Sequence, residues 1–153
     1  METQQKKGFV LIGIRHPGKT TNENGQSGID CGNLWQKFEK EGYAARIPAR
    51  VGDEVYAVYF DYEGDHTQPF AYFIGCKVRS GVDVPEGMAK LEVPAGDYTL
   101  VRAKGKMPDC MVNAWKEVWE SDIPRAYGMD FEVYGEKSRD WSNAKVAIYL
   151  SVR

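Results

Sequence analysis

The stretch GMDFEVY, residues 128–134, has the composition of a β-strand and carries two carboxylates. Side chains alternate between the two faces of a strand, so Asp130, Glu132 and Tyr134 are predicted to share one face. An ionised carboxylate is rarely buried without a partner, because its desolvation costs several kcal/mol. Several explanations of Glu132 therefore stay open: a structural counter-ion, an acid–base group, the partner of a cationic ligand, or an acid exposed on a half-solvated strand.

Length and composition indicate one globular domain over residues 1–153, because 42% of the residues are hydrophobic and 27% are charged. The net charge of −2 gives no basic field for direct nucleic-acid binding. No apolar run is long enough to span a membrane, and the N-terminus lacks the apolar core of a signal peptide. The three cysteines are widely spaced, which favours reduced thiols and a cytoplasmic location.

In the first half of the chain, apolar runs predict strands at residues 9–14, 55–62 and 70–78, the last two joined as a hairpin. Residues 29–41 are predicted to be helical. Cys31, Leu34, Trp35 and Phe38 recur there at helical spacing, and Gly42 follows as a stop signal.

The same order recurs in the second half, with a helix between strands and a tryptophan in the middle of each half's helix (Trp35 and Trp115). Its predicted elements are a short strand at 88–93, strands at 97–103, 129–134 and 145–152, and a helix at 109–120. Sequential hairpins require antiparallel pairing. The predicted class is therefore α+β, a pseudo-twofold duplicated β-α-β-β fold (halves about 8–78 and 88–153), with a curved antiparallel sheet and two helices on one face.

One phosphate-binding pattern occurs by letter: GIRHPGKT at residues 13–20 matches the P-loop. A P-loop needs a helix that begins at its Lys-Thr, whereas Lys19 and Thr20 run into a polar, glycine-rich loop. Nucleotide binding is therefore not predicted. The two histidines lie far apart in the sequence, and no metal-ligand or catalytic-nucleophile motif occurs, so no metal, cofactor or catalytic residue is predicted.

Four motifs in order resemble the GyrI-like effector-binding family, the drug-binding domain of AraC-type and MerR-type regulators. They are VPEGM at 84–88, PAGDY at 94–98, two tryptophans four residues apart at 115–119, and DFEVY at 130–134. The resemblance is carried by these motifs in the second half and by topology in the first. It is closest in kind to stand-alone members such as the cationic-drug-binding proteins carried on integron cassettes, and it implies a ligand cleft between the helices and the sheet.

The resemblance also implies which residues bind the ligand. In the family, the glutamate of the DFExY strand is the buried anion that meets lipophilic cations, a role that falls on Glu132. Aromatic walls are a family feature. The ligand-binding residues implied are Glu132, Tyr134, Trp115, Tyr59, Phe60 and Tyr72.

The function implied is that of a non-enzymatic binding module for hydrophobic, often cationic, small molecules. Relatives of this fold suggest two alternatives: a hydrolase that opens reactive cyclopropane-containing compounds, and a protein inhibitor of a topoisomerase. Regulators of the family carry a helix-turn-helix domain, which this sequence lacks. Transcriptional control would therefore require a separate DNA-binding partner. Sequestration of a drug would require no such partner.

Overall fold

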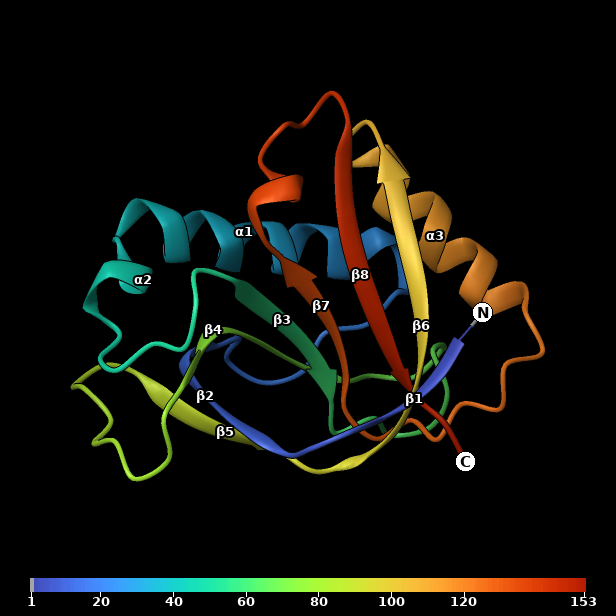
Figure 1. Ribbon diagram of the computed structural model, residues 1–153. Helices are drawn as coiled ribbons and strands as arrows, with labels where there is room; N and C mark the ends of the chain where they lie inside the picture. The colour runs from blue at the N-terminus through green and yellow to red at the C-terminus, as the bar shows by residue number, and fades with distance from the viewer. Residues whose placement is uncertain (1) are drawn as a thin grey trace.

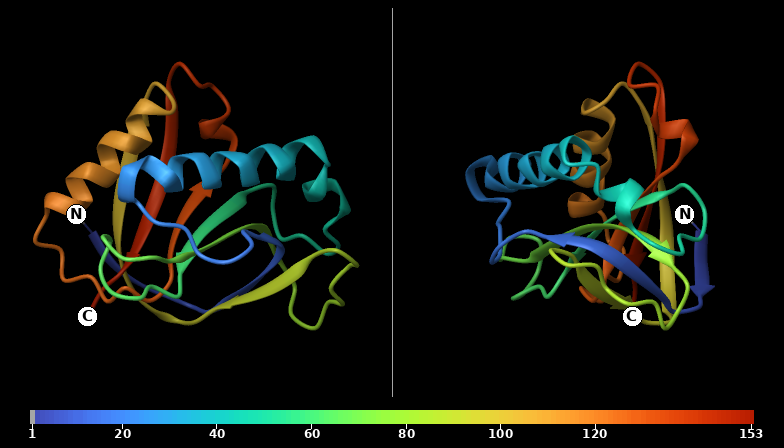
Figure 2. Two further views of the ribbon diagram at one scale, coloured as in Figure 1. Left: turned by 180° about the vertical axis from the view of Figure 1, so that it is seen from behind. Right: turned by 90° about the vertical axis from the view of Figure 1, so that its left-hand side faces the viewer.

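The computed structural model describes residues 2–153 as one eight-stranded antiparallel sheet with two long helices on one of its faces (Figures 1 and 2). The strands are β1 (Glu2–Lys6), β2 (Phe9–Arg15), β3 (Val55–Phe60), β4 (Ala71–Val78), β5 (Ala89–Val93), β6 (Gly96–Gly105), β7 (Asp130–Tyr134) and β8 (Ala144–Ser151). The helices are α1 (Gln26–Lys40), α2 (Tyr43–Arg46) and α3 (Asp109–Glu120), with single 3-10 turns η1 (Glu23–Gly25) and η2 (Glu136–Ser138). The predicted single domain, residues 1–153, includes Met1, which lies outside the described residues.

The predicted duplication is visible in the order of the elements. The run β2-α1-β3-β4 is repeated as β6-α3-β7-β8, and the strands are arranged β1-β6-β8-β7-β3-β4-β2-β5 across the sheet. The two halves meet at the centre of the sheet, where β3 pairs with β7 and Ala57 lies opposite Glu132. The predicted α+β class with an antiparallel sheet is confirmed.

The short strands β1 and β5 are exchanged between the halves. Strand β1 leads into β2 but pairs with β6, and β5 leads into β6 but pairs with β2. Gly8 stands where the two connections pass each other, since a Cβ on it would lie 3.1 Å from the carbonyl oxygen of Val93. Strand β5 was predicted from sequence, whereas β1 was not, because the sequence ETQQK is polar throughout and belongs to an exposed edge.

The sheet is buried on both faces near its centre. On the helix face, Ile12, Ala57 and Ile74 lie in the core under α1, and Ile148 lies in the core under α3. The other face has a separate core around Phe131. In the described part of the chain, no helix is long and apolar enough to cross a membrane.

Candidate functional site

Glu132 lies at the centre of the sheet, on the face that carries the helices. Its neighbours across the two adjoining strands are Ala57 of β3 and Ile148 of β8, both fully buried, and Glu132 itself is 2% exposed. The possibility of an exposed acid on a half-solvated strand is therefore excluded. A carboxylate with apolar residues on both sides in the sheet must find its polar partners in front of the sheet.

Three neutral donors supply those partners. The Tyr59 hydroxyl and the Trp115 indole Nε1 donate to Oε2 of Glu132 at 2.8 and 2.7 Å, and the Tyr134 hydroxyl donates to Oε1 at 2.7 Å. They come from β3, α3 and β7, so both halves of the fold build the site. The contact with Tyr134 confirms that residues 132 and 134 share one face of the strand. The acceptor capacity of this carboxylate is thus largely used by groups that carry no charge.

The electrostatics of Glu132 follow from this environment. Burial raises the pKa of its carboxyl group above the ordinary value, and the hydrogen bonds from Tyr134, Trp115 and Tyr59 oppose that rise. Burial also raises the pKa values of the Tyr59 and Tyr134 hydroxyls, so both remain protonated donors at neutral pH. None of the ion pairs formed by residues 2–153 includes Glu132. Among these residues, no side chain therefore forms an ion pair with its carboxylate.

A cavity of about 690 Å³ lies in front of Glu132, lined by α1, α3 and the helix face of the sheet. All four tryptophans of the sequence line it: Trp35, Trp115, Trp119 and Trp141. Its volume is in the range of cavities that hold drug-sized ligands, and walls rich in hydrophobic and aromatic side chains are typical of such sites. Nine of the 28 residues that line it are Trp, Tyr or Phe.

The aromatic side chains at the base of the cavity form a connected group. The Trp35 indole Nε1 donates to the Tyr72 hydroxyl at 2.8 Å, and the ring of Tyr59 lies 5.0 Å from the rings of both Tyr72 and Trp115. The ring of Trp35 packs edge-on against Tyr134 at 4.8 Å. Trp35 was not predicted as a site residue, although its position in the middle of the first helix, like that of Trp115 in the second, was a usable signal.

The structure brings five of the six predicted site residues together around the cavity: Glu132, Tyr134, Trp115, Tyr59 and Tyr72. Phe60 lies elsewhere, in the core on the opposite face of the sheet. The physical reason is the alternation of side chains, because Tyr59 and its neighbour Phe60 on β3 cannot face the same side. The binding role of the other five stays a prediction.

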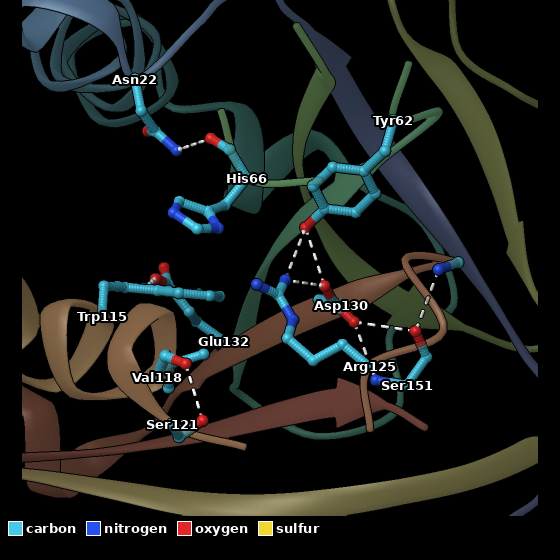
Figure 3. A network of polar contacts seen from close by, with 11 residues as sticks. Asn22, Tyr62, His66, Trp115, Val118, Ser121, Arg125, Asp130, Glu132 and Ser151 are labelled. Carbon is cyan, nitrogen blue, oxygen red and sulfur yellow. Dashed lines mark hydrogen bonds and ion pairs between the residues drawn. The ribbon is translucent and has the colours of Figure 1, made fainter. Parts of the chain in front are cut away.

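A second polar centre lies beside the first, where Asp130 of β7 is completely buried (Figure 3). Nη2 of Arg125 forms an ion pair with Asp130 Oδ2 at 2.7 Å, and the Tyr62 hydroxyl donates to the same oxygen at 2.8 Å. Oδ1 accepts hydrogen bonds from the backbone N–H of Ser151 at 2.7 Å and from its hydroxyl at 2.9 Å. Asp130 is therefore a structural counter-ion, a role that Glu132 does not have.

The P-loop pattern has no phosphate cradle around it. Strand β2 ends at Arg15, and α1 begins only at Gln26, so no helix N-terminus faces Lys19. The ammonium group of Lys19 lies 3.3 Å from Glu63 and 3.9 Å from Asp61. Across residues 2–153, no group of three or more His, Cys, Asp or Glu side chains is arranged to hold a metal ion.

Comparison with known proteins gives consistent matches. A model of the Cass2 family, described as integron-associated effector binding protein, matches residues 2–152. The crystal structure of the integron cassette protein VCH_CASS2, from the mobile metagenome of Vibrio cholerae, has a TM-score of 0.73 at 29% identity, covering 99% of this chain and 95% of that one. The structure of SAV2435 bound to tetraphenylphosphonium has a TM-score of 0.77 at 18% identity, covering 99% and 93%.

One relative is a longer regulator. The transcriptional regulator BrlR of Pseudomonas aeruginosa is 25% identical over 158 aligned residues, which cover 97% of this chain and 53% of BrlR. The chain thus spans about half the length of that regulator.

Proposed function

Because the chain belongs to the Cass2 family of integron-associated effector binding proteins, we propose that it binds hydrophobic cationic small molecules in its aromatic cavity and releases them unchanged. One observation carries this proposal. Glu132 is 2% exposed and has three neutral donors but no cationic partner among the ion pairs of the described residues. A bound cation would supply the missing counter-charge.

The chemistry of the cavity wall suits a flat or multi-ring cation. Indole and phenol rings attract cations through their negative faces, by roughly 0.5–2 kcal/mol for each close contact. Removing apolar ligand surface from water adds the larger, non-directional part of the free energy. Ligands are therefore selected by their charge and aromatic surface more than by a specific set of hydrogen bonds. Such selection favours a protein that binds several related compounds. The tetraphenylphosphonium bound to SAV2435 is a lipophilic cation of this class.

The biological role we propose is either sequestration of such compounds in the cytoplasm or ligand sensing in transcriptional control. The second role draws on the similarity to BrlR, of which this chain matches only about half. That role would need a DNA-binding unit, supplied by the same protein or by a partner.

Binding of tetraphenylphosphonium, measured by isothermal titration calorimetry, tests the charge anchor. Wild-type protein is expected to bind this cation, and Glu132→Gln is expected to bind it at least about ten-fold more weakly, because a desolvated charge loses its partner. Triphenylphosphine oxide, a neutral compound that keeps three of the four phenyl rings, should be affected much less.

Glu117→Gln is the matched control, because Glu117 is an exposed acid on α3 and the substitution changes the net charge equally. This variant should bind like wild type. Equal losses for the cation and the neutral compound in Glu132→Gln, or no loss for either, would refute the role of Glu132 as charge anchor.

A hydrolytic function is the second candidate, and the raised pKa of a buried glutamate beside two tyrosine hydroxyls is the observation that favours it. Incubation with a cyclopropane-containing electrophile, followed by mass spectrometry, would decide. Ring-opened product that forms with wild type but not with Glu132→Gln would support catalysis, and unchanged substrate would exclude it for that compound.

A further inference from the structure

Arg125 lines the same cavity, and two of its three guanidinium nitrogens have no hydrogen-bond partner among residues 2–153. Its side chain is buried, with the residue 5% exposed. Nη2 serves Asp130 at 2.7 Å and lies 3.5 Å from the Tyr62 hydroxyl, whereas Nε and Nη1 are buried without a hydrogen-bond partner among residues 2–153. Buried donors of a guanidinium are rarely left unpaired, since desolvation without a new hydrogen bond is unfavourable.

One of these two nitrogens, Nη1, lies on the side of the cavity-lining residues His66 and Trp115. In Figure 3, Nη1 of Arg125 points away from Asp130, toward the side on which His66 and Trp115 lie. The Trp115 ring centre is 5.8 Å from the guanidinium carbon, and the indole Nε1 of the same residue donates to Glu132. One indole therefore links the two polar centres.

The ring of Tyr127 packs against Arg125, and Tyr127 has an unusual backbone conformation. The ring of Tyr127 lies 4.3 Å from the guanidinium carbon, and its residue has a φ of 53°. This left-handed conformation is uncommon for a residue with a bulky side chain and is typical of places where the surrounding structure fixes a local geometry. Tyr127 also packs edge-on against Tyr62, which contacts the same ion pair.

We propose that Arg125 is a second ligand anchor, which receives a neutral hydrogen-bond acceptor such as a carbonyl oxygen on a ligand whose cationic group faces Glu132. The proposal rests on the cation-binding function proposed above and narrows its ligand class. Preferred ligands are aromatic cations that also carry a carbonyl or similar oxygen. The oxygen and the positive centre must be far enough apart to reach Arg125 and Glu132, which lie on either side of the Trp115 indole.

Charge balance favours a neutral acceptor over an anionic one. Arg125 and Asp130 form a neutral pair, and a ligand cation neutralises Glu132. A ligand carboxylate would add a negative charge beside two buried carboxylates, and that charge would be costly to desolvate. The other arginine that lines the cavity, Arg139, is exposed and so lies at its solvent side. A carbonyl oxygen accepts a hydrogen bond from the unpaired Nη1 without that cost.

Three matched phosphonium salts test the proposal: (para-acetylbenzyl)-, (para-isopropenylbenzyl)- and (para-carboxybenzyl)triphenylphosphonium, together with their meta isomers. They are similar in shape, and the first two carry the same charge. On wild-type protein, one acetyl isomer should bind about ten-fold more tightly than its isopropenyl counterpart, the factor expected for a hydrogen bond to a charged group. The carboxy compounds should bind most weakly.

Protein variants assign the preference to Arg125. Arg125→Met with Asp130→Asn removes the ion pair without leaving one charge buried, and it should bind the acetyl and isopropenyl compounds equally. Glu132→Gln should weaken both and keep the acetyl preference. The double variant also alters the packing of the sheet, so its folding is checked by thermal melting. If it does not fold, the comparison of acetyl and isopropenyl compounds on wild-type protein still tests the proposal.

The outcomes separate the two proposals. If the salts bind wild type but acetyl and isopropenyl compounds bind equally at both positions, Arg125 is only a structural ion pair stacked on aromatic rings, and the second anchor is refuted while cation binding stands. If none of the salts binds, the proposed function fails together with its extension.

Discussion

Two acids on one strand, Asp130 and Glu132, share a face of β7 and have opposite surroundings. Asp130 has a guanidinium, a phenol and a backbone N–H as partners, and its charge is balanced within the protein. Among residues 2–153, Glu132 has only neutral donors, and no ion pair balances its charge. Burial is common to both acids, so it is not the basis of the ligand-anchor role that we propose for Glu132. That proposal rests on a buried carboxylate whose partners among the described residues are all neutral.

The unbalanced charge predicts that Glu132→Gln stabilises the ligand-free protein at neutral pH. The folded-state pKa of Glu132 is raised, so its ionised form costs stability once the pH exceeds the unfolded value of about 4.3. The variant should be more stable than wild type by more than about 1 kcal/mol at neutral pH, because a buried unpaired charge is removed. The difference should disappear as the pH falls below the unfolded value. Urea unfolding of both proteins across this pH range measures it.

Ligand binding should show the matching pH dependence. A bound cation favours the ionised carboxylate, so affinity for tetraphenylphosphonium should be full above the raised pKa of free Glu132 and should fall as the pH drops through it. Glu132→Gln should show no such fall. A wild-type affinity that is constant through the acid range would contradict the assignment.

At the residue scale, the sequence was sufficient to predict that Glu132, Tyr134, Trp115, Tyr59 and Tyr72 lie together, but not that Arg125 and Trp35 join them. Their binding role stays a prediction. The DFEVY motif predicted Glu132 and Tyr134, and strand alternation could have removed Phe60 once Tyr59 was chosen. Arg125 lies in an irregular segment between α3 and β7, where neither periodicity nor a motif relates it to the cavity. Its position depends on the pairing of distant strands.

At the element scale, helix α1 carries two glycines on the side that lines the cavity, Gly28 and Gly32. They are one helical turn apart, and a Cβ on either would meet nothing within 4 Å. Glycine in a helix interior costs roughly 0.5–1 kcal/mol relative to alanine, so close packing does not explain these residues. They leave open space in front of the helix.

Because of this open space, substitutions at Gly32 are expected to change the stability of the protein and its ligand binding independently. Gly32→Ala should stabilise the protein by about 0.5–1 kcal/mol, because the helix gains propensity without a clash. Gly32→Leu should extend into the cavity and weaken tetraphenylphosphonium binding while the melting temperature is maintained. Thermal melting and calorimetry on the same samples test both statements, and unchanged binding by Gly32→Leu would contradict the cavity assignment.

Gly13→Ala in β2 is the contrasting control. A Cβ there would collide with the backbone oxygen of Ile74 on β4, so the variant should lose stability.

Burial also decided which helices and strands could be predicted from the sequence. Strands and helices with apolar faces were predictable, whereas β1 and α2 were not, because exposed polar edges and single turns carry no periodic apolar signal.

At the scale of the whole molecule, neither half is a complete unit. The β3–β7 pairing joins them at the centre, and each half receives a short strand from the other, β1 on β6 and β5 on β2. The three donors to Glu132 likewise come from both halves. The duplication was predictable from the repeated element order, but the exchange was not, because pairing partners are set by the three-dimensional crossing of the two connections.

The exchange predicts that the halves fold only together. A cut between Glu86 and Gly87, in the exposed loop before β5, gives fragments 1–86 and 87–153. Fragment 1–86 contains β1 but lacks its partner β6, and fragment 87–153 contains β5 but lacks its partner β2. Each fragment also lacks one strand of the central β3–β7 pair, so its circular dichroism should be that of an unfolded chain. Mixed fragments should recover β-structure and a cooperative melt. A fragment that folds alone would contradict this account of the topology.

The placement of the tryptophans has an optical consequence. Since Trp35, Trp115, Trp119 and Trp141 all line the cavity, every indole emitter of the protein sits within reach of a bound molecule. The intrinsic fluorescence is therefore a built-in reporter of occupancy. A coloured aromatic cation should quench it by resonance energy transfer, and a colourless one should shift its emission maximum by displacing water, so both kinds of ligand can be titrated without a label.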